Sequence, residues 1–178
     1  MSKTTKILIA GFGGQGILFA GKALAFTGLK VGLEVSWLPS YGPEMRGGTA
    51  NCSVTLSDTP IGSPIVDKPD VLIAMNLPSL EKYLNETEKG GYIVYDSSLI
   101  NKQELREDVN VFDIPATKLA SDNNLGGLAN MIIIGKVIKE TGVLSLEQIK
   151  NSLSEMVPAK KADLLQNNIK AIELGFNY

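Results

Sequence analysis

Histidine does not occur at any of the 178 positions of this chain. Without an imidazole, the chain has no side chain of the usual general-base type, no histidine ligand for zinc, and no Ser-His or Cys-His nucleophile. Carboxylates remain, so acid–base catalysis is still chemically available. The composition nevertheless favours a binding platform over a self-sufficient catalyst.

Cysteine occurs once, as Cys52. A single thiol cannot form an internal disulfide, and it cannot supply the four thiolates that hold an iron–sulfur cluster. Cys52 lies on the apolar side of a segment in which apolar and polar residues alternate. We therefore predict a buried packing role for it rather than a reactive one.

Long apolar runs and an excess of one charge are also missing. The longest apolar stretch, residues 131–134, is far below the roughly 18 residues that span a bilayer, and we find no secretory leader. The net charge of −2 gives no electrostatic attraction to nucleic acid or to an anionic membrane. We expect a cytoplasmic protein that binds neither.

The pattern of apolar residues indicates one α/β domain over residues 1–178, a Rossmann-like three-layer fold with a mainly parallel sheet. Residues 50–56 alternate with period two, which is typical of antiparallel pairing in part of the sheet. Asn76 before Leu77-Pro78, and Ser145 with Gln148, are helix-start signals. The predicted strands are 6–10, 31–37, 50–56, 71–75, 91–95 and 109–112, and the predicted helices are 15–28, 76–86, 116–121, 125–140, one from 145, and 160–174.

A glycine-rich turn follows the first predicted strand, with the sequence Gly11-Phe12-Gly13-Gly14-Gln15-Gly16. A strand, a glycine turn and a helix start can point backbone N–H groups at a phosphate. In a dinucleotide site, Gly11 would allow the tight turn, Gly13 the approach of a pyrophosphate, and Gly16 close helix–strand packing. Three interpretations stay open: a tight β–α turn alone, an NAD or FAD site, or a site for another phosphate-bearing ligand.

An NAD site also needs an acidic residue at the end of the second strand, for the ribose hydroxyls. Glu34 is close in count but lies inside the predicted strand, and no Asp or Glu falls where that strand should end. The extra Gly14 and the amide of Gln15 are further departures from the simple fingerprint.

A second motif lies in a long loop predicted over residues 38–48, with the sequence Ser40-Tyr41-Gly42-Pro43-Glu44-Met45-Arg46-Gly47-Gly48. Ser40 and Tyr41 carry hydroxyls, and Arg46 can fork onto a phosphate or a carboxylate. Long loops of this kind are often functional. The alternative without a functional role is a surface ion pair between Glu44 and Arg46.

These two motifs, followed by Val54-Thr-Leu-Ser-Asp58 and Pro60-Ile-Gly-Ser-Pro64, resemble the gamma subunit of 2-oxoacid:ferredoxin (acceptor) oxidoreductases. Members act on pyruvate, 2-oxoglutarate, 2-oxoisovalerate or indolepyruvate. The likeness covers nearly the whole chain and is sharpest from Gly11 to Pro64. The C-terminal third adds Asn123-Asn-Leu-Gly-Gly127.

The resemblance implies a subunit that is inactive alone and works in a complex with alpha, beta and, in some complexes, delta subunits. Such a complex decarboxylates a 2-oxoacid, makes an acyl-CoA and passes electrons to ferredoxin. It implies that thiamine diphosphate and the iron–sulfur clusters belong to partner subunits, and that this chain helps to hold coenzyme A. We expect 2-oxoglutarate or a branched-chain acid as substrate, and a homodimer when the chain is isolated.

On this basis we hypothesise that Gly13, Gly14, Gln15 and Gly16 meet the CoA diphosphate after the turn begun at Gly11. Ser40, Tyr41 and Arg46 would close around the ligand or meet a partner subunit. No catalytic residue and no metal ligand is assigned to this chain. Two alternatives remain, a free-standing NAD(P)-dependent oxidoreductase and a purely structural assembly module.

Overall fold

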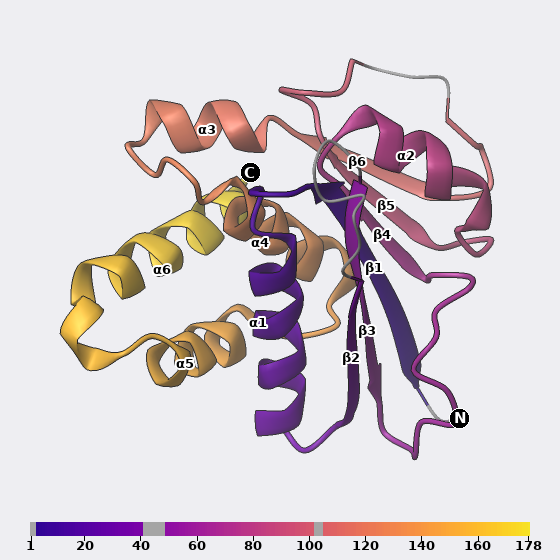
Figure 1. The fold of residues 1–178 in the computed structure, drawn as a ribbon, viewed down its shortest axis with the longest axis horizontal. Coiled ribbons are helices and arrows are strands. Elements are labelled where there is room, and N and C mark those ends of the chain that lie inside the picture. The colour runs from indigo at the N-terminus through magenta and orange to yellow at the C-terminus, as the bar shows by residue number, and fades with distance from the viewer. Residues whose placement is uncertain (1–2, 41–48, 102–104) are drawn as a thin grey trace.

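The computed structural model describes residues 3–40, 49–101 and 105–178. Within them, two helices interrupt a run of six strands and four helices follow the last strand, in the order that the apolar pattern predicts (Figure 1). The strands are β1 (Thr4–Phe12), β2 (Glu34–Ser40), β3 (Thr49–Ser57), β4 (Val71–Ala74), β5 (Tyr92–Asp96) and β6 (Asn110–Ile114). The helices are α1 (Ile17–Lys30), α2 (Leu77–Tyr83), α3 (Ala116–Asp122), α4 (Ala129–Thr141), α5 (Leu146–Met156) and α6 (Ala162–Asn177), with short 3₁₀ turns at Leu84–Glu86 and Ala159–Lys161.

The strands form one sheet in the order β2-β3-β1-β4-β5-β6. The pairs β1–β4, β4–β5 and β5–β6 are parallel, whereas β3 runs antiparallel to both of its neighbours, β1 and β2. The prediction of a mainly parallel sheet with some antiparallel pairing is therefore confirmed. Its antiparallel strand is the one that the period-two pattern indicated.

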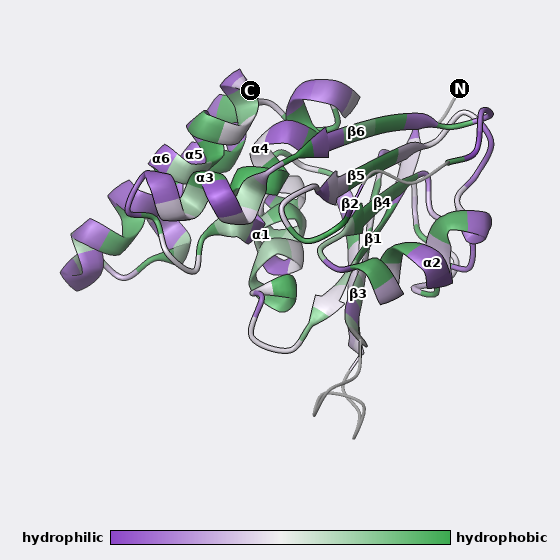
Figure 2. Cartoon of the chain, turned by 90° about the horizontal axis from the view of Figure 1, so that it is seen from above, coloured by the Kyte–Doolittle hydropathy of each residue, from purple (hydrophilic) through white to green (hydrophobic). Residues whose placement is uncertain are grey.

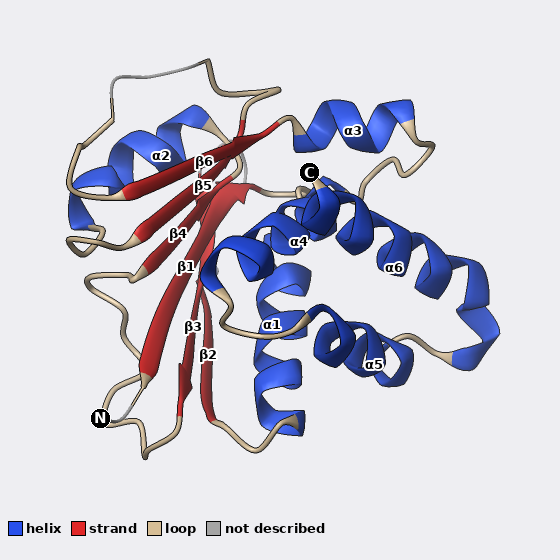
Figure 3. Ribbon diagram, turned by 180° about the vertical axis from the view of Figure 1, so that it is seen from behind, coloured by secondary structure: helices blue, strands red, loops and turns tan. Residues whose placement is uncertain are grey.

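Helices cover the sheet on both faces, which gives the predicted three layers (Figure 3). Helix α2 lies alone on one face, where its Leu80 and Tyr83 pack on Leu8, Leu72 and Ile93 of the strands. The other face carries α1, α4, α5 and α6 over the larger core. Coloured by hydropathy, the inner strands form the apolar centre of the molecule (Figure 2). The carboxyl ends of β1, β4 and β5 therefore lie between α2 on one face of the sheet and the larger group of helices on the other.

Local signals placed several element ends correctly. Asn76 caps α2, and its Oδ1 accepts a hydrogen bond from the Ser79 N–H at 2.8 Å. Ser145 and Gln148 form the predicted capping box at the start of α5. The second strand was predicted too early, at residues 31–37. Helix α1 continues to Lys30, and Gly32 then turns the chain with φ +84° before β2 begins at Glu34.

Three other predictions were wrong in detail. The helix predicted over 125–140 begins only at Ala129, because Asn124 and Gly127 have positive φ and hold the preceding segment in a loop. From its large apolar ring the sequence predicts Trp37 as a core residue, but it is 37% exposed. Strand β3 is buried on both faces rather than one, since Ser57 on its polar side is covered and shares a hydrogen bond with Thr4 at 2.8 Å.

Helices α4 and α6 cross with their backbones in contact. A Cβ atom on Gly175 would overlap the carbonyl oxygen of Ile132, and one on Gly135 would overlap that of Ile172. Both glycines face the partner helix, and because neither has a side chain, the two helix backbones can approach each other closely. Helix α4 also contacts β5 and α1, and its Asn130 donates to the carbonyl of Gly16, shortly after the end of β1.

Candidate nucleotide-binding site

The glycine turn lies between β1 and α1, at the carboxyl edge of the parallel strands. Strand β1 continues to Phe12, and the Gln15 N–H returns to the Phe12 carbonyl at 3.2 Å. Gly14 and Gly16 have φ values of +93° and +73°, in the region that favours glycine. Gly16 is the N-cap of α1, and no side chain caps this helix or puts an acidic group in its first turn. The first N–H groups of α1 are therefore available to an anion.

Gln15 ties this turn to the neighbouring strand. Its Oε1 accepts from the Phe12 N–H at 2.6 Å, and its Nε2 donates to the Met75 carbonyl at 2.9 Å, just past β4. Gly11 belongs to β1, and a Cβ there would lie 2.6 Å from the Gln15 Oε1. Gly11 thus makes room for the amide rather than forming the turn itself. One hydrogen of Nε2 is left for a ligand.

We predicted that Gly16 allows close packing of a helix on a strand, but in the structure Gly16 contacts another helix. A Cβ on Gly16 would overlap the amide nitrogen of Asn130, which donates to the Gly16 carbonyl at 3.1 Å. Asn130 belongs to α4, so this glycine packs the turn against a helix from the C-terminal half. The Oδ1 of Asn130 is buried and has no hydrogen-bond partner.

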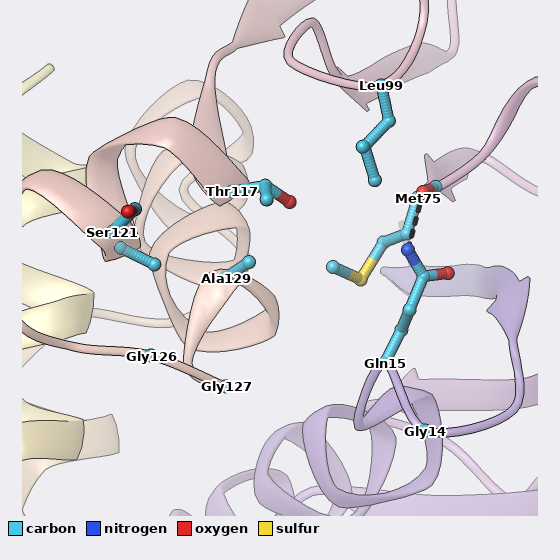
Figure 4. Close-up of a pocket in the computed structure, with 10 residues that line it drawn as sticks. Gly14, Gln15, Met75, Leu99, Thr117, Ser121, Gly126, Gly127 and Ala129 are labelled. Carbon is cyan, nitrogen blue, oxygen red and sulfur yellow. Dashed lines mark hydrogen bonds between the residues drawn. The ribbon is translucent and has the colours of Figure 1, made fainter.

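A cavity of about 380 Å³ opens beside the turn, at the carboxyl ends of β1 and β4 (Figure 4). In doubly wound sheets, ligands bind at this edge, where successive connections leave in opposite directions. The figure shows Gln15 and Met75 on one wall facing α3 and the 126–127 loop on the other. The lining residues are Gly14, Gln15, Met75, Leu99, Thr117, Ala120, Ser121, Gly126, Gly127 and Ala129.

The far wall of the cavity is fixed by a buried carboxylate. Asp96, the last residue of β5, is fully buried, and its Oδ1 accepts from the Ser98 N–H at 3.0 Å. Its Oδ2 accepts from the N–H and the hydroxyl of Thr117, at 3.0 and 2.5 Å. Asp96 therefore acts as a turn and cap residue after β5, and it holds the start of α3 at the sheet edge.

A second cavity, of about 260 Å³, lies on the other side of the glycine turn. Phe12, Leu18, Phe19 and Ala50 line it, together with Gly13, Gly14, Gly16 and Ile17. No charged side chain among the described residues lines either cavity. An anion here would be held by the backbone N–H groups and the positive end of α1.

The predicted site residues fall into two groups. Gly14 and Gln15 line the larger cavity, Gly13, Gly14 and Gly16 line the smaller one, and Gly11 supports the turn from within β1. Ser40 ends β2 at the sheet edge, paired with Asn51, and lines neither cavity. Tyr41 and Arg46 lie outside the described residues. Glu34 begins β2, six positions before its end, so it does not supply the acidic clamp of an NAD site.

Sequence reasoning missed Met75, Leu99, Thr117 and Ser121. Strand ends could have indicated the first two, because Met75 and Leu99 follow β4 and β5. Thr117 and Ser121 carry no local signal, since their place depends on how α3 packs. Gly126 and Gly127 belong to the motif Asn123–Gly127 that the sequence singled out without a role.

Cys52 is fully buried, as predicted. Burial raises the pKa of its thiol from 9.0 to about 12, against the lowering effects of hydrogen bonds with Trp37 and Gly21. We expect no alkylation of the folded chain by iodoacetamide at pH 8 and full alkylation in denaturant. A folded chain that reacts as fast as the denatured one would contradict this.

The raised pKa of the Cys52 thiol makes the free energy of unfolding depend on pH. The folded thiol keeps its proton to higher pH than the unfolded thiol, so unfolding becomes easier as the pH rises from 9.0 towards about 12. Below pH 9.0 the contribution of Cys52 is fully present. A Cys52→Ala control should lose this part of the pH dependence.

Comparison with known proteins identifies the family to which the chain belongs. The family described as pyruvate ferredoxin/flavodoxin oxidoreductase matches residues 6–178. The chain belongs to this family. None of the helices in the described part of this family member is long and apolar enough to cross a bilayer.

Relatives within the family are similar over almost the whole chain. The 2-oxoglutarate synthase subunit KorC of Methanocaldococcus jannaschii is 35% identical over 174 residues, covering 96% of this chain and 91% of that protein. The ketoisovalerate oxidoreductase subunit VorA of Methanothermobacter marburgensis is 35% identical over 177 residues, covering 99% of this chain. The chain spans only 37% of the length of that VorA protein.

Solved structures of the family have the same fold. The keto/oxoacid ferredoxin oxidoreductase gamma subunit of Geobacter sulfurreducens gives a TM-score of 0.82 at 28% identity, covering 97% of this chain and 96% of that one. The 2-oxoglutarate:ferredoxin oxidoreductase of Magnetococcus marinus gives 0.89 at 27% identity, covering 98% of this chain and 31% of that one. The latter was solved with 2-oxoglutarate, coenzyme A and succinyl-CoA bound.

Proposed function

We propose that this chain is the gamma component of a CoA-acylating 2-oxoacid:ferredoxin oxidoreductase, and that it binds coenzyme A at the glycine turn. The observation that carries the proposal is the cavity at the carboxyl ends of β1 and β4, beside an uncapped helix start. The complex would decarboxylate a 2-oxoacid, transfer the acyl group to the CoA thiol, and pass both electrons released to ferredoxin.

Coenzyme A fits the residues present better than NAD does. The N–H groups at the start of α1 suit its diphosphate, and Gly14 and Gly126 each have open space where a side chain would project. The acidic residue that a nicotinamide dinucleotide would need is not at the end of β2, where Ser40 lies. The Magnetococcus structure with bound CoA supports the same ligand class.

The remaining chemistry belongs, in this proposal, to partner subunits. With one cysteine and no histidine, the chain does not provide the ligands of an iron–sulfur cluster. We place the clusters and thiamine diphosphate on alpha, beta or delta partners, and the subunit names of the relatives support a multi-subunit complex. The KorC and VorA names support 2-oxoglutarate or a branched-chain 2-oxoacid as the substrate.

The first test is anaerobic purification of the tagged chain from its native cells. Co-purifying proteins would be identified, and the eluate assayed for viologen reduction that depends on both a 2-oxoacid and CoA. A brown complex that is active only with CoA supports the proposal. A colourless homo-oligomer without that activity would overturn it and make NADH binding the next measurement.

Arg46 provides a sharper test within that complex. We expect Arg46→Ala to raise the KM for CoA about tenfold, the loss of one charge-assisted contact, with little change in the KM for the 2-oxoacid. Lys68→Ala, an exposed change just before β4 at the opposite edge of the sheet, is the control. Equal effects of Arg46→Ala on both KM values, or none, would remove Arg46 from the CoA site.

A further inference from the structure

A cavity that the proposed function does not use lies at the amino end of β1, the opposite end of that strand from the glycine turn. Its volume is about 230 Å³. The sheet forms its floor, where Thr4 and Lys6 of β1 lie opposite Ser57 and Thr55 of β3. Residues of the segment 60–65 line it as well, so the Pro-Ile-Gly-Ser-Pro motif of the sequence forms part of this cavity.

The cavity carries one positive charge that nothing in the described chain neutralises. Lys6 is exposed, and none of the ion pairs between described residues uses its ammonium. Asp70 is close in space, but its Oδ2 accepts the backbone N–H of Lys6 at 2.7 Å, and it does not line the cavity. No acidic side chain of the described residues lines it. An ammonium among hydroxyl groups attracts an anion.

Thr55 gives an independent indication of a missing ligand. It is only 3% exposed and lines the cavity, yet its hydroxyl takes part in no hydrogen bond between described residues. Ser57, two positions further on, shares a hydrogen bond with Thr4 at 2.8 Å and accepts the Thr59 N–H at 3.1 Å. A buried hydroxyl without a partner costs free energy, so such groups are normally paired. The unpaired hydroxyl and the unpaired ammonium belong to directly opposite residues.

Size and charge favour one carboxylate on a short stem. A cavity of about 230 Å³ is below the roughly 300–1,000 Å³ of pockets that hold small-molecule ligands. Glu34 of β2 lies opposite Ser57 on the same face of the sheet, so it would repel a second negative charge on the ligand. A phosphate dianion is therefore disfavoured. Ile61 and Ile65 offer apolar contacts to a methylene stem.

The sheet face around the cavity is open to another protein. Helix α2 packs on β1, β4 and β5, and no described residue of β2 or β3 belongs to the apolar cluster beneath it (Figure 3). Ile65 is 60% exposed and Leu38 is 42% exposed. Leu38 lies opposite Ser53, two positions along β3 from Thr55. Exposed apolar side chains beside an unneutralised charge offer a partner both buried area and a charge contact.

We propose that this cavity receives the carboxylate of an aspartate or glutamate from a partner subunit. The carboxylate forms an ion pair with the Lys6 ammonium and accepts a hydrogen bond from the Thr55 hydroxyl. This inference rests on the proposed function, which places the chain in a complex. It adds a docking contact at the end of β1 that is remote from the glycine turn.

Zero-length cross-linking of the purified complex tests the ion pair directly. A water-soluble carbodiimide activates a carboxylate, and an amine in contact with that carboxylate then forms an amide, while the carbodiimide takes up the water as a urea. We expect a cross-linked peptide that joins Lys6 to an aspartate or glutamate of a partner subunit. Lys6→Arg keeps the charge, but its guanidinium does not form this amide, so the variant should assemble and lose the cross-link.

Dilution of the complex measures the strength of the contact. We expect Lys6→Ala to raise about tenfold the concentration at which half of the tagged chain separates from its partners, and Lys6→Glu to raise it further. Thr55→Val should raise it severalfold. Lys170→Ala, a change of an exposed lysine on α6, is the control and should leave it unchanged.

Thermal unfolding of the isolated chain separates docking from a purely structural role. Thr55→Val removes a hydroxyl that has no partner within the described chain, so its Tm should not fall below that of the wild type. A lower Tm would assign the hydroxyl to the fold and overturn its part in docking.

The outcomes distinguish this inference from the proposed function. A CoA-dependent complex in which Lys6 forms no cross-link to a partner, or in which Lys6→Ala and Lys170→Ala dissociate alike, would overturn the docking contact and uphold the proposed function. Acetylation of Lys6 that is as fast in the complex as in the isolated chain would also overturn the contact. A chain that never co-purifies with partner subunits would overturn both.

Discussion

Replacing Gly175 by alanine should lower the free energy of unfolding by about 3 kcal/mol, at the upper end of overpacking penalties. The new Cβ would overlap the Ile132 carbonyl oxygen, and because this is backbone, no side-chain rotation relieves the contact. Helices α4 and α6 would have to move apart. The better helix propensity of alanine offsets only about 1 kcal/mol.

Thermal unfolding of the purified chain measures this effect. In a domain of this size, a loss of about 3 kcal/mol lowers Tm by roughly 6–12 °C. Gly135→Ala, whose Cβ would overlap the Ile172 carbonyl, should behave alike, whereas Gly62→Ala, with open space, should change Tm little. If Gly175→Ala and Gly62→Ala gave the same Tm, the close crossing of α4 and α6 would be wrong.

The second large effect is expected at Asp96. Asp96→Ala leaves the Ser98 N–H, the Thr117 N–H and the Thr117 hydroxyl without their acceptor. Ser98 and Thr117 are themselves exposed, so water partly replaces the lost acceptor, and we expect a loss of about 1–3 kcal/mol. Since Thr117 also lines the larger cavity, the KM for CoA should rise in complexes that still assemble.

Denaturant unfolding, with the KM for CoA measured in parallel, checks this second prediction. Asp96→Asn keeps one carbonyl oxygen and should be intermediate. The matched control is Asp122→Ala at the end of α3, which removes only an exposed ion pair with Lys118 and should cost about 0.5 kcal/mol or less. An Asp96→Ala variant as stable as Asp122→Ala would show that the carboxylate does not hold α3.

Much of the fold could be predicted because its signals are local. The alternation in β3, the Asn76 cap and the Ser145–Gln148 capping box each use neighbours within a few residues. Errors arose where tertiary packing decides the outcome. Trp37 looks like a core residue by composition, but it lies on the edge strand β2, where no further strand covers it.

The site was predicted in part for the same reason. The glycine turn is readable from sequence because only glycine easily adopts the φ values of Gly14 and Gly16. The role of Gly11 could not be predicted from the sequence. It depends on Gln15, whose side chain is oriented by the carbonyl of Met75, a residue far away in the sequence. The wall formed by Thr117 and Ser121 requires the packing of α3 against α4 and its hydrogen bonds to Asp96 at the end of β5, which no short sequence pattern encodes.

The reversed direction of β3 has a consequence for how such a protein can change. Because β3 is antiparallel, it starts at the edge where β1 and β2 end, with Phe12 opposite Thr49 and Ser40 opposite Asn51. The connection between β2 and β3 therefore leaves from and returns to the edge that carries the candidate site. Insertions or deletions in it would change the surroundings of that site while the strand register stays intact. An all-parallel arrangement would carry this connection to the far edge, so the hairpin makes ligand preference separable from folding.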